Sequence, residues 1–154
     1  MVVAATEATV ASHAYQRALE QQGLQATEKA CPLFVPLVEE GWVEHRVTEE
    51  VAHIYMDEVF HDGARDADVL VLGCTHYPLL RPLLRRVVPP QVEIVDSAES
   101  TAASVAEILG KGRGQVSSGE LRCYATDSVE KFRRLGSKFL GSPIEHIELV
   151  DIEK

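Results

Sequence analysis

Three consecutive residues with reactive side chains, Cys74, Thr75 and His76, stand near the middle of the chain. They follow residues 69–72, an apolar run without a polar face, which is typical of a strand buried on both sides. Pro78 suits the first turn of a following helix. The sequence therefore places a thiol, a hydroxyl and an imidazole at the carboxyl end of a strand, where open α/β sheets bind their ligands.

A thiol in this position has the means to transfer a proton. Thiolate is favoured near the N-terminus of a helix and beside a histidine, and Thr75 adds a hydrogen-bond donor. The alternative is that Cys74 is an inert, buried residue, as many cysteines are. The residues alone leave both interpretations open.

Length and composition fit a globular protein. The 154 residues suffice for one domain with a sizeable core, or for a small domain with an appendage. Hydrophobic residues make up 45% and charged residues 25% of the chain. The formal net charge of −9 argues against general nucleic-acid binding but still permits an anionic small substrate.

No apolar run is long enough for a transmembrane helix, and the first residues lack the basic region of a secretory signal. Three widely spaced cysteines do not suggest a disulfide framework, and the scattered histidines argue against a zinc site. These features predict a cytoplasmic protein without a metal and without a membrane partner.

The hydrophobic pattern alternates between strands and helices along the whole chain. It predicts strands within residues 1–5, 24–30, 69–72, 92–95, 121–125 and 144–152, with a loop over residues 110–119. Helices are expected between successive strands. This order is typical of an α/β fold with a mostly parallel sheet flanked by helices.

Threonine residues are expected to cap two of the helices. Thr6 or Thr9 is expected to cap a helix over residues 10–22, and both hydroxyls could also serve a ligand. Thr48 is expected to cap a helix whose inner face carries an apolar set, Val51, Ile54, Tyr55, Val59 and Phe60. Between these helices, Glu39 and Glu40 follow an apolar segment, so one of them could face inward.

With these residues in view, the chain resembles the glutamate racemases of the aspartate/glutamate racemase superfamily. The most specific match is Leu-Gly-Cys-Thr-His-Tyr-Pro-Leu-Leu at residues 72–80. Residues 5–10, 14–15, 30–41 and 124–141 match in the same order, so the likeness extends over essentially the whole chain.

The resemblance implies cofactor-independent interconversion of L- and D-glutamate by two bases, which supplies D-glutamate for peptidoglycan and so serves cell-wall biogenesis and cell shape. Cys74 matches one base, with the direction that it serves left open. His76 matches a position that assists the thiol and binds substrate, as does Thr75. Thr6 and Thr9 match a stretch close to the substrate carboxylate.

The resemblance also implies an auxiliary acid near His76, for which Glu39 is the candidate and Glu40 the alternate. The small-molecule partner is expected to be the substrate, L- or D-glutamate, and no cofactor is expected. Proton transfer on both faces of a carbon needs groups that ionise near neutral pH and donors that stabilise the developing charge.

One part of the family pattern is absent. The family carries an Asp-Ser near its first strand, a Pro-Tyr-Gly and a second catalytic cysteine followed by Asn-Thr, none of which occurs here. Neither Cys31 nor Cys123 has that context. Residues 1–95 are therefore expected to form one complete lobe of a two-lobe fold, and residues 96–154 to supply elements of the other. A chain that begins inside a core strand fits a truncated racemase.

Three interpretations follow. The first is a truncated glutamate racemase with one base, whose exposed strand edges favour self-association into a homo-oligomer. The second is a non-catalytic glutamate-binding module or one that depends on a partner. The third is an enzyme that acts on another acidic C–H bond next to a carbonyl group.

Overall fold

The computed structural model describes residues 1–110 and 121–152, so the predicted loop at 110–119 lies almost wholly outside the described residues. The chain divides into two compact units, Met1–Ile108 and Leu109–Lys154. The first unit ends beyond the predicted boundary at residue 95 and contains all of the candidate site residues.

A four-stranded parallel sheet forms the centre of the first unit, in the order β2-β1-β3-β4. Its strands are β1 (Val2–Ala5), β2 (Thr27–Ala30), β3 (Val69–Gly73) and β4 (Glu93–Asp96). Strand β1 is completely buried, as its apolar residues require between two helical layers. The predicted α/β class with a parallel sheet is confirmed.

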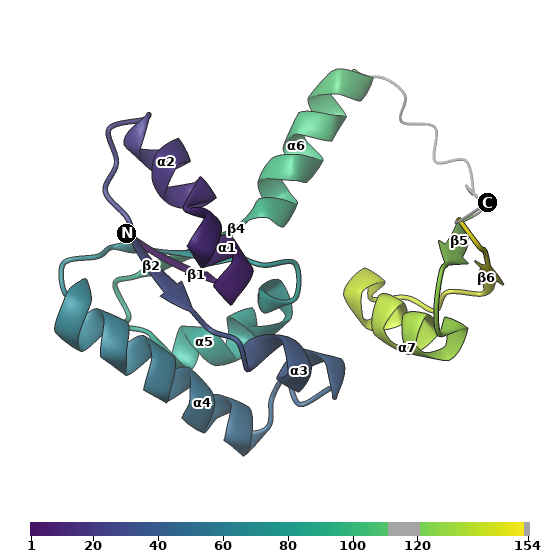
Figure 1. The fold of residues 1–154 in the computed structure, drawn as a ribbon, viewed down its shortest axis with the longest axis horizontal. Coiled ribbons are helices and arrows are strands. Elements are labelled where there is room, and N and C mark those ends of the chain that lie inside the picture. The colour runs from purple at the N-terminus through teal and green to yellow at the C-terminus, as the bar shows by residue number, and fades with distance from the viewer. Residues whose placement is uncertain (111–120, 153–154) are drawn as a thin grey trace. The chain divides into compact units, whose positions relative to one another are not determined.

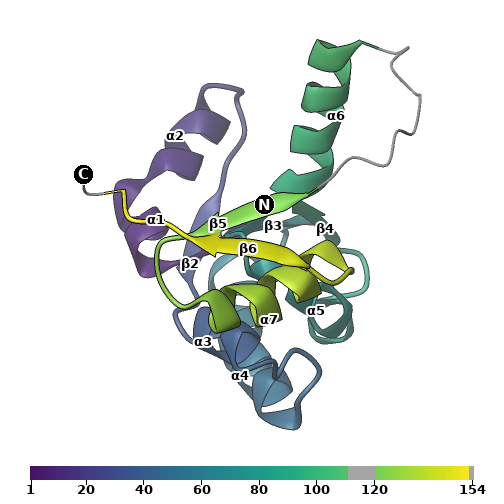
Figure 2. The same cartoon turned by 90° about the vertical axis from the view of Figure 1, so that its right-hand side faces the viewer.

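Helices cover both faces of this sheet (Figures 1 and 2). Helices α1 (Glu7–Ser12) and α2 (Ala14–Glu20) connect β1 to β2 on one face. Helices α3 (Phe34–Glu39), α4 (Arg46–Asp57) and α5 (Arg81–Val87) lie on the other. Connections between parallel strands are right-handed crossovers. The chain moves in one direction from β1 to β2 and in the opposite direction from β2 across β1 to β3. The two connections therefore lie on opposite faces of the sheet.

Shorter helical segments and one long helix complete the first unit. The π-helix Glu58–Gly63 extends α4, and the 3₁₀ helix Tyr77–Leu80 leads into α5. Helix α6 (Ser97–Leu109) follows β4, and the Asp96 carboxylate accepts a hydrogen bond from the Ala98 amide at its start.

The core lies mainly between the sheet and the layer of α3, α4 and α5. Its largest fully buried side chains include Tyr77, Phe34, Met56, Leu70 and Leu72. The ring of Phe34 packs edge-on against Tyr55 and Tyr77, with centroids 5.3 and 5.2 Å apart. Such pairs add to the stabilisation that comes from apolar burial.

Two expectations for α4 are wrong. His45, rather than Thr48, caps the helix, because its Nδ1 accepts the Val47 amide at 3.2 Å. Thr48 lies one turn later, fully buried, and donates its hydroxyl to the Trp42 carbonyl. Ile54 is 64% exposed, and Ala52 and Met56 occupy the inner face instead.

The predicted helix over residues 10–22 is two short helices. Thr6 caps α1, but His13 then adopts a left-handed conformation with φ 49° and separates α1 from α2. A residue other than glycine rarely adopts this conformation, so the sequence offers no sign of the break.

The second unit consists of a strand–helix–strand motif. Strands β5 (Arg122–Ala125) and β6 (His146–Leu149) pair in parallel, and α7 (Val129–Leu140) connects them. Ser128 caps α7 by accepting the Lys131 amide. Among the described residues of this unit, the only buried apolar side chains are Ala125 and Ile144.

Candidate active site

The register of the sheet brings the candidate residues to one edge. Ala5 of β1 is paired with Gly73 of β3 and with Ala30 of β2. Thr6, Cys74 and Cys31 therefore follow directly at the carboxyl ends of three adjacent strands. This is the edge at which the sequence predicts a ligand site.

Cys74 is half-buried in a tight turn, whose closing hydrogen bond runs from the Tyr77 amide to the Cys74 carbonyl at 3.2 Å. The helix that follows differs from the expectation. A single turn of 3₁₀ helix precedes α5, so few peptide dipoles align toward the thiol, and the helix dipole is weaker than a long α-helix would provide.

His76 lies between a hydroxyl and a carboxylate. Its Nδ1 is 3.3 Å from the Thr75 Oγ1, and its Nε2 is 3.4 Å from the Glu39 Oε1. Both the imidazole and the Glu39 carboxylate are about three-quarters buried, with side-chain exposures of 24% and 29%. A carboxylate at Nε2 favours a proton on that nitrogen, which leaves Nδ1 to accept from Thr75.

The structure distinguishes the two glutamates. Glu39 ends α3 and faces His76, whereas Glu40 is exposed at the next position. Helix α3 packs beside the 3₁₀ helix that follows the Cys74 turn, and this packing brings residues 39 and 76 together. The geometry thus selects Glu39 as the neighbour of the imidazole.

Thr6 and Thr9 lie together at the start of α1. Their hydroxyl oxygens are 2.9 Å apart, and Thr6 Oγ1 also accepts the Thr9 amide at 3.3 Å. Both residues are partly buried. The capping role predicted for this pair belongs to Thr6, and the paired hydroxyls stand beside the end of β1.

Cys31 has a different character although it ends the neighbouring strand. It is fully buried, and this burial raises the pKa of its thiol to about 12. The Tyr77 hydroxyl donates to the Cys31 carbonyl at 2.8 Å, and burial raises the pKa of that phenol as well. Cys31 is a core residue that cannot supply a base at neutral pH.

Tyr15 of α2 is a neighbour of the site that the sequence does not reveal. A Cβ atom added to Gly73 would lie 3.1 Å from Tyr15 Cε2 and 3.3 Å from the Ala4 carbonyl oxygen. Gly73 therefore lets this ring approach the strand end just before Cys74. Only the tertiary fold brings these residues together, so no local pattern predicts the contact.

The described residues contain no group of three or more His, Cys, Asp and Glu side chains arranged to hold a metal ion. No helix formed by those residues is long and apolar enough to cross a membrane.

Comparison with known proteins identifies the family of the chain. A family model described as Asp/Glu/Hydantoin racemase matches residues 1–105, which include every candidate site residue. The chain belongs to the Asp/Glu/hydantoin racemase family.

Curated members of the family with similar sequences are glutamate racemases. The chain is 51% identical to the glutamate racemase of Koribacter versatilis, with 99% of this chain and 60% of the relative covered. It is 42% identical to that of Neisseria gonorrhoeae, with 97% and 56% covered. The chain thus spans less than two thirds of the length of these relatives.

Solved racemase structures share the fold. The glutamate racemase of Francisella tularensis, in complex with D-glutamate, matches 99% of this chain over 57% of its own length, with a TM-score of 0.86 and 31% identity. That of Thermus thermophilus, in complex with β-chloro-D-alanine, matches 99% over 56%, with a TM-score of 0.76 and 38% identity. These matches do not favour a non-catalytic module.

Proposed function

We propose that this racemase-family chain carries one base of a glutamate racemase, with Cys74 as the base. The observation that supports this most is the half-buried Cys74 thiol at a strand end, two residues before His76, which is itself paired with Glu39. The activity that the relatives share indicates glutamate as the substrate. The hydroxyl groups of Thr6 and Thr9 lie just after the end of the adjacent strand β1.

The chemistry follows from the side chains. The Cys74 thiolate removes the α-proton of glutamate, so the C–H bond breaks, an S–H bond forms, and the electron pair remains on the α-carbon. The carboxylate of the substrate accepts part of this charge. Hydroxyl donors at Thr6, Thr9 and Thr75 bind this carboxylate both before and during the proton transfer.

Glu39 and His76 serve the thiol. A Glu39 carboxylate that accepts from Nε2 holds a proton on that nitrogen and orients the imidazole. The oriented imidazole, two residues after Cys74, assists the thiol in the proton transfer. His76 and Glu39 act through Cys74 in this scheme, and His76 also contacts substrate.

The second proton transfer requires a second base, and neither of the other two cysteines fits this role. Cys31 is buried and protonated at neutral pH, and Cys123 is not followed by the Asn-Thr of the second racemase cysteine. We therefore place the opposing base in the part of a racemase that this chain does not cover. The second unit contributes elements of the lobe that this part forms. The chain alone exchanges the α-proton on one face and does not invert the carbon.

A complementation assay tests the proposal. The 154-residue chain is mixed with the part of the Koribacter versatilis racemase that it does not match, and D- to L-glutamate conversion is followed by chiral chromatography. We expect conversion by the mixture and a loss of at least about 1000-fold with Cys74→Ser, as for the removal of a proton-transferring group.

Cys123→Ser is the matched control and should retain the activity of the mixture. Racemisation by the Cys74→Ser mixture at the unmutated rate would contradict the assignment of the base. Racemisation by the 154-residue chain alone would contradict the one-base proposal.

A further inference from the structure

Helix α1 carries Thr9 and follows Thr6, and it is only partly covered by α2 and β2. Of its six residues, Thr9 and Val10 are partly buried and none is fully buried. A helix this short is not stable by itself in water. Interactions at its two ends therefore add to this partial packing in fixing its position.

The first end is fixed by Thr6, whose carbonyl accepts the Val10 amide at 3.0 Å and whose hydroxyl caps the helix. The other end is His13. Its amide donates to the Val10 carbonyl at 2.9 Å, and its backbone is left-handed with φ 49° and ψ 27°. This conformation is unfavourable for a residue with a Cβ, so another interaction must compensate for it.

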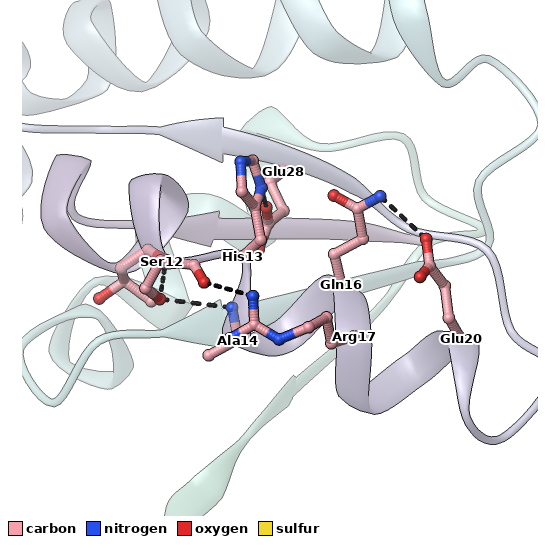
Figure 3. Close-up of polar contacts among 8 residues, drawn as sticks. Ser12, His13, Ala14, Gln16, Arg17, Glu20 and Glu28 are labelled. Atoms are coloured by element: carbon pink, nitrogen blue, oxygen red, sulfur yellow. Dashed lines mark hydrogen bonds and ion pairs between the residues drawn. The ribbon is translucent and has the colours of Figure 1, made fainter.

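That interaction is with Glu28 of strand β2. The His13 Nδ1 lies 2.9 Å from the Glu28 Oε2 (Figure 3). The Glu28 side chain is only 6% exposed, and its Oε1 has no hydrogen-bond partner among the described residues. A buried carboxylate is costly unless it is paired, so the contact with His13 is the principal compensation for burying Glu28.

We propose that His13 and Glu28 are positioning residues that fix α1 to the sheet and thereby place the Thr6 and Thr9 hydroxyls for substrate. Glu28 is paired with Val3 of β1, the strand that ends just before Thr6. The His13–Glu28 contact therefore links the C-terminal end of α1 to β2, next to β1, the strand from which the N-terminal end of α1 begins. This inference rests on the proposed function only where substrate is concerned.

Hydrogen bonds of Ser12 connect the segment around His13 with Thr9. The Ser12 hydroxyl donates to the Thr9 carbonyl at 2.6 Å and accepts the Ala14 amide at 3.3 Å, so it spans the junction (Figure 3). The Arg17 guanidinium donates to the Ser12 carbonyl at 2.8 Å. Displacement of His13 would reach the turn that contains Thr9 through these bonds.

The other charged groups nearby do not replace the contact. Glu20 of α2 accepts from Gln16 on its own helix, and Arg17 is engaged with Ser12 (Figure 3). Glu7 lies in the first turn of α1, at the opposite end from His13. Lys29 pairs with Glu58 at 2.6 Å.

Amide hydrogen exchange tests the inference without any reference to activity. In Glu28→Ala we expect protection of the Val10 and His13 amides to fall by at least about tenfold, equivalent to about 1.4 kcal/mol. The Glu93 amide, which bonds to the Asp68 carbonyl in the sheet, should keep its protection. Glu28→Gln retains an acceptor oxygen and should restore most of the protection.

Gln16→Ala breaks a neighbouring hydrogen bond on α2 and is the matched control that should leave α1 unchanged. Unaltered protection of Val10 in Glu28→Ala would overturn the inference, as would an equal loss at Glu93. Should Glu28→Ala fail to fold, His13→Ala removes the same contact and keeps the Cβ in the left-handed conformation. It must then give at least the same local loss.

Kinetics of the complemented racemase extend the test to the substrate. Loss of the contact should raise the KM for glutamate by about tenfold with little change in kcat, because the hydroxyls bind substrate in the ground state as well. An equal fall in kcat and kcat/KM would contradict this part. If the mixture with the unmutated chain does not racemise glutamate, the proposed function is contradicted. Amide hydrogen exchange then still decides whether His13 and Glu28 position α1.

Discussion

Cys31 and Cys74 end adjacent strands of one sheet, yet their environments give them opposite chemistry. Cys31 has no exposed surface, and burial holds its thiol protonated. Cys74 is partly accessible and stands beside Thr75 and His76. Residue type alone cannot separate them, whereas the flanking sequence of Cys74 can.

The Cys31 thiol should make stability depend on alkaline pH. Its folded pKa of about 12 lies above the value of a free thiol, so the folded state holds a proton that the unfolded state releases. The free energy of unfolding should therefore fall between about pH 9 and 12. Denaturant melts of Cys31→Ala should show a shallower fall than the unmutated chain over that range, with Cys123→Ala as the control. Parallel pH profiles would contradict the burial of a protonated thiol.

The choice between Glu39 and Glu40 cannot be predicted from the local sequence pattern. Residues 39 and 40 are adjacent acids after the same apolar segment, and local pattern treats them alike. The preference for Glu39 arises from the packing of α3 beside the turn that contains His76, which is a contact across 37 positions of sequence. Family resemblance, rather than spacing, is what points to this acid before the structure is known.

At the scale of elements, strands are predicted well and helix ends poorly. Apolar runs such as residues 69–72 identify the buried parallel strands because both faces must be apolar. The break at His13 escapes prediction because a left-handed histidine has no sequence signature. Thr48 misleads because a threonine followed by acidic residues suggests a cap, while its hydroxyl instead bonds to Trp42 inside the fold.

Elements beside the site pack closely at Gly73. Gly73→Ala should lower the free energy of unfolding by about 1–3 kcal/mol, because the new methyl group would crowd Tyr15, the Ala5 side chain and the Ala4 carbonyl. Gly63→Ala is the matched control, since its position is open and its backbone is not left-handed. It should be neutral or stabilising by up to about 1 kcal/mol. Equal effects in urea melts would contradict close packing at β3.

At the scale of the whole molecule, the two units differ in how well they can stand alone. The first has a four-stranded sheet with helices on both faces and nearly all of the buried apolar residues described. The second has two parallel strands and one amphipathic helix without a buried residue. Two strands rarely form a stable unit without further packing.

Separate expression tests this difference. Residues 1–108 should unfold cooperatively on heating, with a sigmoidal loss of helical circular dichroism. Residues 109–154 should show a gradual, non-cooperative change, because their described part buries little apolar surface. A cooperative transition in the isolated second unit would show that its own core suffices and would remove the reason to propose that it needs the rest of a racemase.

The central claim is that the Cys74 thiol exchanges a proton with the α-carbon of glutamate. Proton NMR in deuterium oxide measures this directly on the 154-residue chain, through loss of the Cα–H signal together with the chirality of the product. We predict deuterium at Cα of one enantiomer with its configuration retained, and no exchange above background with Cys74→Ser. Equal exchange by Cys74→Ser and the unmutated chain would contradict the account, as would a complete absence of exchange with both enantiomers at saturating concentrations.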